Sequence, residues 1–177
     1  MTRYAAFLRG INVGGHNLVK MADLQRLFVS LRFTNVKTYI QSGNVMFDAP
    51  EKDPHEITKR IEKGLLKLLG FEVKVFVRTI LQIEEMLNQN PFKKVKSSDE
   101  VKMYVTFLAE ELKMKPMLPL ISANKDLEVI CIEGCDVFSL SRPYKGRSTF
   151  PNNFVEANFR VQATTRNWET VKKMMGR

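Results

Sequence analysis

The sequence contains few of the residues that build metal and disulfide sites. Two histidines and two cysteines occur among its 177 residues. Cys131 and Cys135 flank Gly134 in a predicted hairpin turn, and two cysteines cannot form a disulfide framework. A zinc site needs more ligands than this neighbourhood offers. We therefore expect reduced thiols, as is usual in the cytoplasm, with no metal and no cofactor.

Long apolar runs are also absent. No run approaches the roughly 20 residues that a bilayer-spanning helix needs. The N-terminal stretch Met1–Arg9 is interrupted by charge too early to form the core of a signal peptide. These absences predict a cytoplasmic protein without a membrane partner.

Acidic residues are scarce at both ends of the chain. Residues 1–48 hold six Lys and Arg against two Asp and Glu, and residues 142–177 hold eight against two. The middle, residues 49–141, is nearly neutral with fourteen against fifteen. A basic excess of this kind favours an anionic partner, either a nucleic acid or a phosphorylated small molecule. The alternative is that the charge only keeps the protein soluble.

The first half of the chain predicts an α+β fold. Apolar periodicity and turn signals give the order β-α-β-β-α-β, which is the ferredoxin-like arrangement. The predicted elements are strand 3–8, helix 20–32, strands 36–40 and 45–47, a helix that begins after the N-cap Asp53 and ends at Gly70, and strand 71–77 with one wet face.

The second half predicts a smaller α+β part. Its expected elements are a strand from about 100, a short helix over 110–117, a hairpin over 127–140, a helix after Pro151 and a last helix with Thr165 as its N-cap. A short helix over 79–87 should precede it. We expect a ferredoxin-like domain over 1–90, a connection over 91–99 and a second domain over 100–177.

A glycine-rich segment follows the first predicted strand. It contains Arg9, Gly10, Asn12, Gly14 and Gly15. The spacing from the first to the last of these glycines is that of a phosphate-binding P-loop, but His16-Asn17 stands where that motif requires Lys and then Ser or Thr. Nucleotide hydrolysis by this loop is therefore not expected. Glycine-rich backbone before a helix can still present N–H groups to an anion, or it can simply be a strand-to-helix turn.

Three further segments supply candidate ligand-binding residues. Ser42, Gly43 and Asn44 suit either a hairpin turn or a small hydrogen-bonding cluster. A basic loop with one aromatic residue carries Arg147. In the expected first turn of the last helix lie Arg166 and Asn167, and an arginine there either has a partner or serves a ligand. The only tryptophan, Trp168, is expected to anchor the core with Val171 and Met174.

Three motifs together resemble the bacterial family called domain of unknown function 1697. They are FLRGINVGG at residues 7–15, QSGNV at residues 41–45 and ATTRNWETV at residues 163–171. The resemblance extends over essentially the whole chain. It implies a two-part α+β protein with a ferredoxin-like first part, and it implies no activity. It marks Arg9, Gly10, Asn12, Gly14, Gly15, Ser42, Gly43, Asn44, Arg166, Asn167 and Trp168 as signature positions.

Three functions remain open at this point. The first is binding of an anionic ligand, with Arg9, Arg147 and Arg166 on phosphate and Asn12 and Asn44 orienting the ligand. The second is a small-molecule enzyme with its site in a cleft between the two halves, where Arg9, Asn12, Ser42 and Asn44 hold the substrate. The third is a structural or interaction protein in which the signature residues serve turns and caps.

Overall fold

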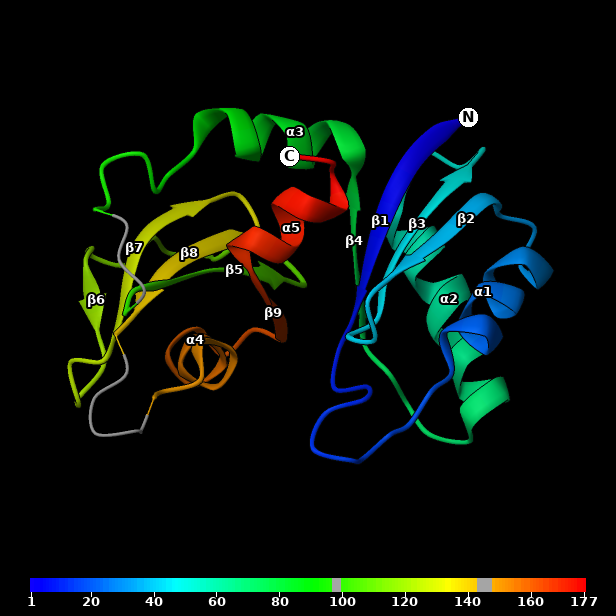
Figure 1. Ribbon diagram of the computed structural model, residues 1–177, viewed down its shortest axis with the longest axis horizontal. Helices are drawn as coiled ribbons and strands as arrows, with labels where there is room; N and C mark the ends of the chain where they lie inside the picture. Colours follow the sequence, from blue (N-terminus) through cyan, green and yellow to red (C-terminus); the bar gives the residue numbers. More distant parts are fainter. Residues whose placement is uncertain (97–99, 143–147) are drawn as a thin grey trace. The chain divides into compact units, whose positions relative to one another are not determined.

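The computed structural model describes residues 1–96, 100–142 and 148–177. The chain forms two compact units, Met1–Glu85 and Met86–Arg177. Figure 1 labels the helices and strands of both. Each unit has its own antiparallel sheet, which confirms the predicted α+β class. Of the expected connection over 91–99, residues 97–99 lie outside the described part.

The first unit is a four-stranded antiparallel sheet with two helices. Its elements are β1 (Thr2–Leu8), α1 (Met21–Ser30), β2 (Thr34–Tyr39), β3 (Asn44–Ala49), α2 (Pro54–Leu69) and β4 (Val75–Thr79). The strand order is β2-β3-β1-β4. The element order is therefore the β-α-β-β-α-β order that the sequence predicts.

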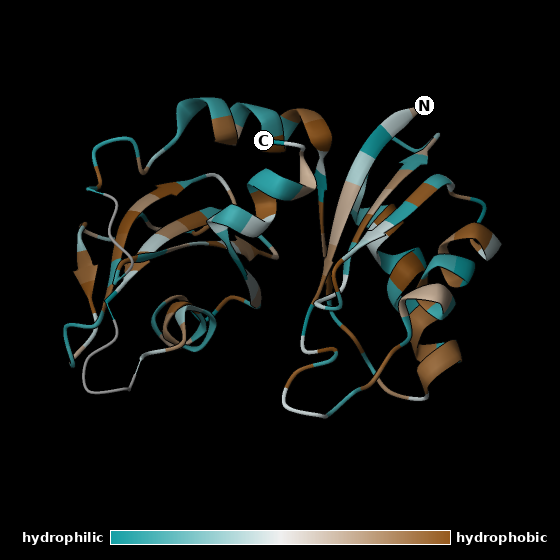
Figure 2. Ribbon diagram, viewed as in Figure 1, coloured by the Kyte–Doolittle hydropathy of each residue, from teal (hydrophilic) through white to brown (hydrophobic). Residues whose placement is uncertain are grey.

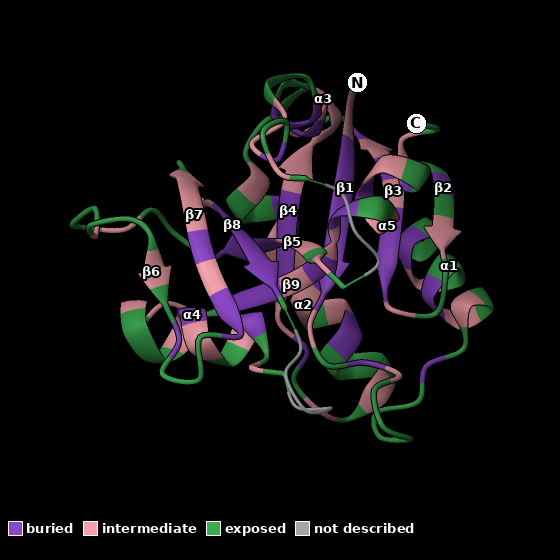
Figure 3. Cartoon of the chain, turned by 60° about the vertical axis from the view of Figure 1, so that its left-hand side comes forward, coloured by how far each residue is buried: buried purple, intermediate pink, exposed green. Residues whose placement is uncertain are grey.

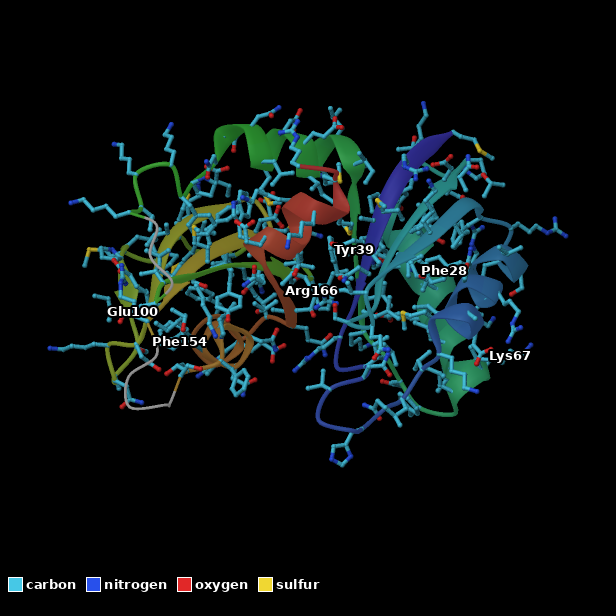
Figure 4. All side chains as sticks on the ribbon, viewed as in Figure 1. Phe28, Tyr39, Lys67, Glu100, Phe154 and Arg166 are labelled. Atoms are coloured by element: carbon cyan, nitrogen blue, oxygen red, sulfur yellow. The ribbon has the colours of Figure 1, made fainter. Side chains whose placement is uncertain are left out.

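One face of this sheet packs against both helices. Alternate residues of β1, including Tyr4 and Leu8, lie in one buried cluster with Phe28 of α1 and Ile61 of α2. Since side chains alternate along a strand, this places every second residue of β1 against the helices. Figure 4 labels Phe28 at this position, and Figure 2 shows hydrophobic and hydrophilic bands along α1 and α2.

The ends of α2 agree with the sequence signals. The Asp53 carboxylate accepts a 2.8 Å hydrogen bond from the backbone N–H of His55, and Pro54 is the first helical residue. At the other end Gly70 takes a left-handed φ of 77° and its N–H donates to the carbonyl of Leu66. These are the N-cap and C-cap that the sequence predicts.

The second unit is built on a five-stranded antiparallel sheet. Its strand order is β6-β7-β8-β5-β9. Helix α3 begins in the first unit and ends in the second. The elements are α3 (Ile80–Gln89), β5 (Lys102–Leu108), β6 (Leu120–Ile121), β7 (Leu127–Glu133), β8 (Asp136–Ser141), α4 (Pro151–Phe159), β9 (Ala163–Asn167) and α5 (Trp168–Met174). Figure 3 shows that β1, β3 and β8 are largely buried.

Several sequence predictions for α3 and for the second unit are confirmed. The capping box of α3 forms, because Thr79 N–H donates to Gln82 Oε1 and Gln82 N–H donates to Thr79 Oγ1. The hairpin of β7 and β8 turns at Gly134, and α4 begins at Pro151. Trp168 is a core anchor, since its ring meets Phe92 and Phe138 edge-on at centroid distances of 5.1 Å and 6.1 Å.

Four local predictions are wrong. Residues 110–117 form bends instead of a helix, since Pro116 and Pro119 leave too few consecutive helix-forming residues. The last strand of the first unit begins at Val75 instead of residue 71, and Val75, Phe76 and Val77 are all buried, so it has no wet alternating face. The last helix begins at Trp168, and Thr165 lies in β9.

The strand β9 is the reason for the last error. Its residues pair with β5 along Tyr104–Leu108, and the β-branched Thr164 and Thr165 suit that ladder. The predicted first helical turn is therefore extended, and Asn167 caps α5 in place of Thr165 by accepting a 2.8 Å bond from the Glu169 N–H. The predicted order of the second half, β-α-β-β-α-α, is corrected to β-β-β-β-α-β-α.

Candidate functional site

The glycine-rich segment folds into a tight hairpin between β1 and α1. Gly14 and Gly15 have left-handed φ values of 57° and 78°, and the His16 N–H donates to the Val13 carbonyl at 3.0 Å. A two-residue hairpin of type I′ needs positive φ at both central residues, so the Gly-Gly pair is explained by the turn itself. Figure 1 shows this loop leading from β1 to α1.

Asn12 ties this loop to the turn between β2 and β3. Its Nδ2 donates to the Val19 carbonyl at 3.0 Å and to the Gln41 carbonyl at 2.8 Å. Its Oδ1 accepts from the Val19 N–H at 2.8 Å. Both amide hydrogens are therefore engaged, and Asn12 is a positioning residue for three chain segments. We call residues 9–19 and 40–44 the tied turns.

The second tied turn is closed by a glycine that has no room for a side chain. A Cβ on Gly43 would lie 2.6 Å from Cδ1 of Ile11 and 2.9 Å from Cβ of Leu8. The Gly43 carbonyl accepts from the Leu8 N–H at 2.8 Å, which joins the turn to the end of β1. The Ser-Gly-Asn segment is thus packed directly against the first glycine loop.

The polar side chains of the second turn form hydrogen bonds in the turn and to the end of β2. Asn44 is fully buried, and its Nδ2 donates to the Tyr39 carbonyl at 3.1 Å and to Ser42 Oγ at 2.9 Å. In the first turn, Asn17 Nδ2 donates to the Gly10 carbonyl at 3.0 Å. These contacts fix the backbone of both turns.

Backbone strain concentrates in the tied turns. Besides the glycines, Asn12, Asn17 and Ile40 have positive φ values of 54°, 50° and 48°. Asparagine tolerates this region, but a β-branched residue in it is a genuine outlier. Strained residues of this kind cluster at functional sites, because the surrounding structure must hold them there. Ile40 is therefore the strongest backbone indication of function in the first unit.

The tied turns are also free of carboxylates. Residues 1–47 contain a single acidic residue, Asp23, and it forms an ion pair with Arg26 on α1. Arg9 and Lys20 lie in or beside the turns, and Lys37 lies in β2, three residues before Ile40. Arg9 is half-buried, and its N–H donates to the Lys74 carbonyl at 2.9 Å. The tied turns themselves therefore carry basic residues and no acidic ones.

The remaining predicted residues belong to the second unit. Arg166 is buried in β9, and its Nη1 donates to Thr164 Oγ1 and to the Thr165 carbonyl, both at 2.9 Å. Burial lowers the pKa of this guanidinium to about 10, so it stays charged at neutral pH. Figure 4 labels Arg166 at the end of β9. Asn167 serves as the cap of α5, and Arg147 lies outside the described residues.

A family model described as protein of unknown function (DUF1697) matches residues 1–138. The chain belongs to this family. The matched residues include both tied turns, whereas Thr164–Trp168 lies beyond them. No curated protein matches the chain. Among solved structures, the chain is similar to the conserved bacterial protein SP0830 from Streptococcus pneumoniae, with 21% identity, a TM-score of 0.69, and coverage of 98% of this chain and 96% of that one. At this identity the likeness shows a shared fold.

Sequence reasoning missed a polar cluster in the second sheet of this DUF1697 protein. Thr106 and Thr165 face each other on β5 and β9 with their Oγ1 atoms 2.7 Å apart. Ser139 is fully buried on β8, and its Oγ has no hydrogen-bond partner in the described part of the chain. The alternation of polar and apolar residues in these strands was the available signal, but it did not show that the polar positions are buried.

Asp126 is a second missed residue. Its buried carboxylate accepts hydrogen bonds from the hydroxyls of Ser122 and Thr149, both at 2.7 Å, and from the Thr149 N–H. Burial alone would raise the pKa of this carboxyl, but the hydrogen bonds outweigh burial and hold the pKa below its ordinary value. Because the Asp126 carbonyl also accepts from the Arg142 N–H, one residue fixes both described ends of the basic loop.

A cavity of about 500 Å³ lies in the second unit beside the C-terminal end of α4. Leu112, Leu120, Phe159 and Val161 supply its apolar lining, and charged residues of both signs surround it. None of the predicted site residues lines it. Within the described ranges, no group of three or more His, Cys, Asp and Glu could hold a metal ion, and no helix is long and apolar enough to cross a bilayer.

Proposed function

We propose that this protein binds an anionic, phosphate-bearing ligand at the tied turns. The observation that carries the proposal is the Asn12 side chain, which holds two carboxylate-free, left-handed turns against each other through three hydrogen bonds. Successive backbone N–H groups in such turns form concavities that attract anions. Because the turns are fixed before the ligand arrives, little ordering cost remains to be met on binding.

Arg9 supplies the charge in this proposal. It follows β1 directly and stands at the start of the first tied turn. The backbones of Gly10, Gly14 and Gly15 supply the N–H groups. Asn12, Ser42 and Asn44 hold the turns in place, since Asn12 bonds to the Val19 and Gln41 carbonyls and Asn44 bonds to Ser42. The glycines are therefore expected to be contact positions and the amides to be supports.

The ligand class includes nucleotides, phosphorylated metabolites and nucleic acid. The tied turns contain no aromatic ring apart from the His16 imidazole. Base stacking relies on aromatic side chains and is therefore not expected within the turns. The proposal therefore places recognition on the phosphate and on the turns.

Amide chemical shifts of the ¹⁵N-labelled full chain test the proposal. Titration with inorganic phosphate, adenosine monophosphate and a short oligonucleotide should move the amide signals of Gly10, Gly14, Gly15 and Gly43. Arg9→Gln should weaken binding about tenfold or more, because a charge-assisted hydrogen bond is lost. Arg32→Gln removes the same charge from an exposed position after α1 and should leave binding unchanged.

Two results would count against the proposal. One is an equal loss of affinity in the Arg9 and Arg32 variants, which would indicate only a general effect of net charge. The other is the absence of any shift at the four glycines with all three probes. Binding that does not weaken as salt rises would also contradict phosphate contacts.

A further inference from the structure

Three large aliphatic side chains are exposed around the Asn12 contacts. Val13 is 63% exposed, Leu18 is 74% exposed and Ile40 is 50% exposed. Each is the chain neighbour of one of the three segments that the Asn12 amide joins, at Asn12, Val19 and Gln41. The hydrogen bonds of the Asn12 amide therefore join the three segments that carry these exposed aliphatic residues. Figure 2 shows hydrophobic segments in the loop that precedes α1.

The local structure does not favour aliphatic residues at these positions. Ile40 takes a left-handed φ of 48°, which glycine or asparagine would adopt at less cost. Val13 is the first residue of the four-residue hairpin that Gly14 and Gly15 turn. Neither turn needs an aliphatic side chain at these positions for its hydrogen bonds. The fold alone therefore does not account for them.

Basic residues flank this aliphatic cluster. Arg9 and Lys20 lie in or next to the tied turns, and Lys37 lies in β2, three residues before Ile40. The single carboxylate of residues 1–47 belongs to Asp23 and is paired with Arg26. The surface thus combines exposed aliphatic tips with cations, which complements a partner that is apolar inside and anionic at its boundary.

The residue types favour a lipid surface over a protein or a nucleic acid. Protein interfaces concentrate their binding energy in Trp, Tyr and Arg, with Leu and Val under-represented. Single-stranded nucleic acids are held by stacking on aromatic rings. The segment 9–20 contains no aromatic ring apart from the His16 imidazole. Aliphatic side chains beside lysine and arginine are the usual combination for anionic membrane surfaces.

We propose that the tied turns dock on an anionic lipid surface. Val13, Leu18 and Ile40 enter the headgroup region, while Arg9, Lys20 and Lys37 meet lipid phosphates. The inference deepens the proposed function and rests on it, since the headgroup phosphate is the anionic group that the turns bind. The sequence predicted no membrane partner because no apolar run spans a bilayer, but docking on the surface requires no such run.

Co-sedimentation of the full chain with vesicles tests this proposal. Wild-type protein should bind vesicles of phosphatidylcholine and phosphatidylserine, and binding should weaken as salt rises. Leu18→Ser should lower the partition coefficient about tenfold, because an aliphatic side chain no longer leaves water. Lys20→Gln should lower it about fivefold. Val29→Ser is the matched control, since Val29 is 57% exposed on α1 outside the tied turns, and it should bind as wild type does.

The outcomes separate this inference from the proposed function. If inorganic phosphate moves the glycine amides but no vesicle binds the protein, docking is refuted and the anion site stands. If vesicles bind wild type and Leu18→Ser equally, or bind equally with and without phosphatidylserine, docking is also refuted. If neither phosphate nor vesicles act on the turns, both proposals fail. Circular dichroism of each variant shows that a loss of binding is not a loss of fold.

Discussion

Replacing Asn12 by alanine should destabilise the first unit more than the matched replacement of Asn17. Asn12→Ala removes three hydrogen bonds, to Val19 O, Gln41 O and Val19 N–H. At about 1 kcal/mol net for each bond, this amounts to about 3 kcal/mol. Alanine at a φ of 54° adds about 1 kcal/mol. The expected total is about 4 kcal/mol.

Asn17 provides the control because it differs mainly in the number of bonds. Its φ of 50° is nearly the same, but its side chain donates one hydrogen bond, to the Gly10 carbonyl. Asn17→Ala should therefore cost about 2 kcal/mol. The difference of about 2 kcal/mol between the two variants isolates the tie between the turns.

Native-state hydrogen exchange of β1 amides is the appropriate measurement. The only tryptophan, Trp168, lies in the second unit, so its fluorescence is not a local probe of the first. The exchange of β1 amides should be about thirtyfold faster in Asn12→Ala than in Asn17→Ala, which corresponds to about 2 kcal/mol. Equal exchange in the two variants would refute the argument that Asn12 joins three segments.

Three further predictions concern single positions. Gly43→Ala should lower the free energy of unfolding by about 2 to 3 kcal/mol, because its Cβ would meet Ile11. Gly70→Ala, with a similar φ but open space, should lower it by about 1 kcal/mol. Equal urea midpoints in the two variants would contradict this. Ile40→Asn should raise stability by about 1 kcal/mol in thermal melts while weakening vesicle binding, and a loss of stability would argue against strain. The Asp126 carboxyl has a lowered folded pKa, so its stabilisation is present above the ordinary carboxyl pKa of 3.8 and is lost as pH falls through the folded value. Asp126→Asn should remove this part of the acid dependence in pH-dependent unfolding followed by Trp168 fluorescence, and an unchanged acid profile would refute it.

The fold of the first unit could be predicted because its signals are local. The 3.6-residue apolar period of α2, its Asp53 cap and its Gly70 stop each lie within a few residues of the feature they specify. The same holds for the capping box at Thr79 and Gln82. Local signals of this kind agree with one another, and sequence patterns then give the correct element.

The error at residues 163–167 arises because long-range pairing decides the structure there. Residues 163–167 carry both a cap signal and β-branched residues, and only the ladder to β5 selects the strand. The sequence therefore predicts Arg166 in the first turn of the last helix, whereas it lies in β9 and is buried. The pairing partner lies about sixty residues away, at Val105, and no local pattern encodes that distance.

The candidate site was predictable in its parts but not in its connection. The sequence indicates two turns, at Gly14-Gly15 and at Ser42-Gly43-Asn44. It leaves open whether each turn is only structural or also binds a ligand. The sequence does not show that the Asn12 amide bonds to the Gln41 carbonyl, which lies 29 positions away. The hydrogen bonds of Asn12 orient the chain, and a role of Asn12 in orienting a ligand stays a prediction.

The tie at Asn12 also bears on whether the turns are only architecture. Architecture explains the glycines, since φ at Gly14 and Gly15 and the closeness of Gly43 to Ile11 require them. It explains the asparagines through their hydrogen bonds. It does not explain a strained, half-exposed Ile40, because asparagine there would relieve the strain and lose no hydrogen bond of its side chain. Ile40 therefore occupies a position where another residue would make the fold more stable, which argues that its side chain contacts a partner. The basic residues of the tied turns indicate that this partner is anionic.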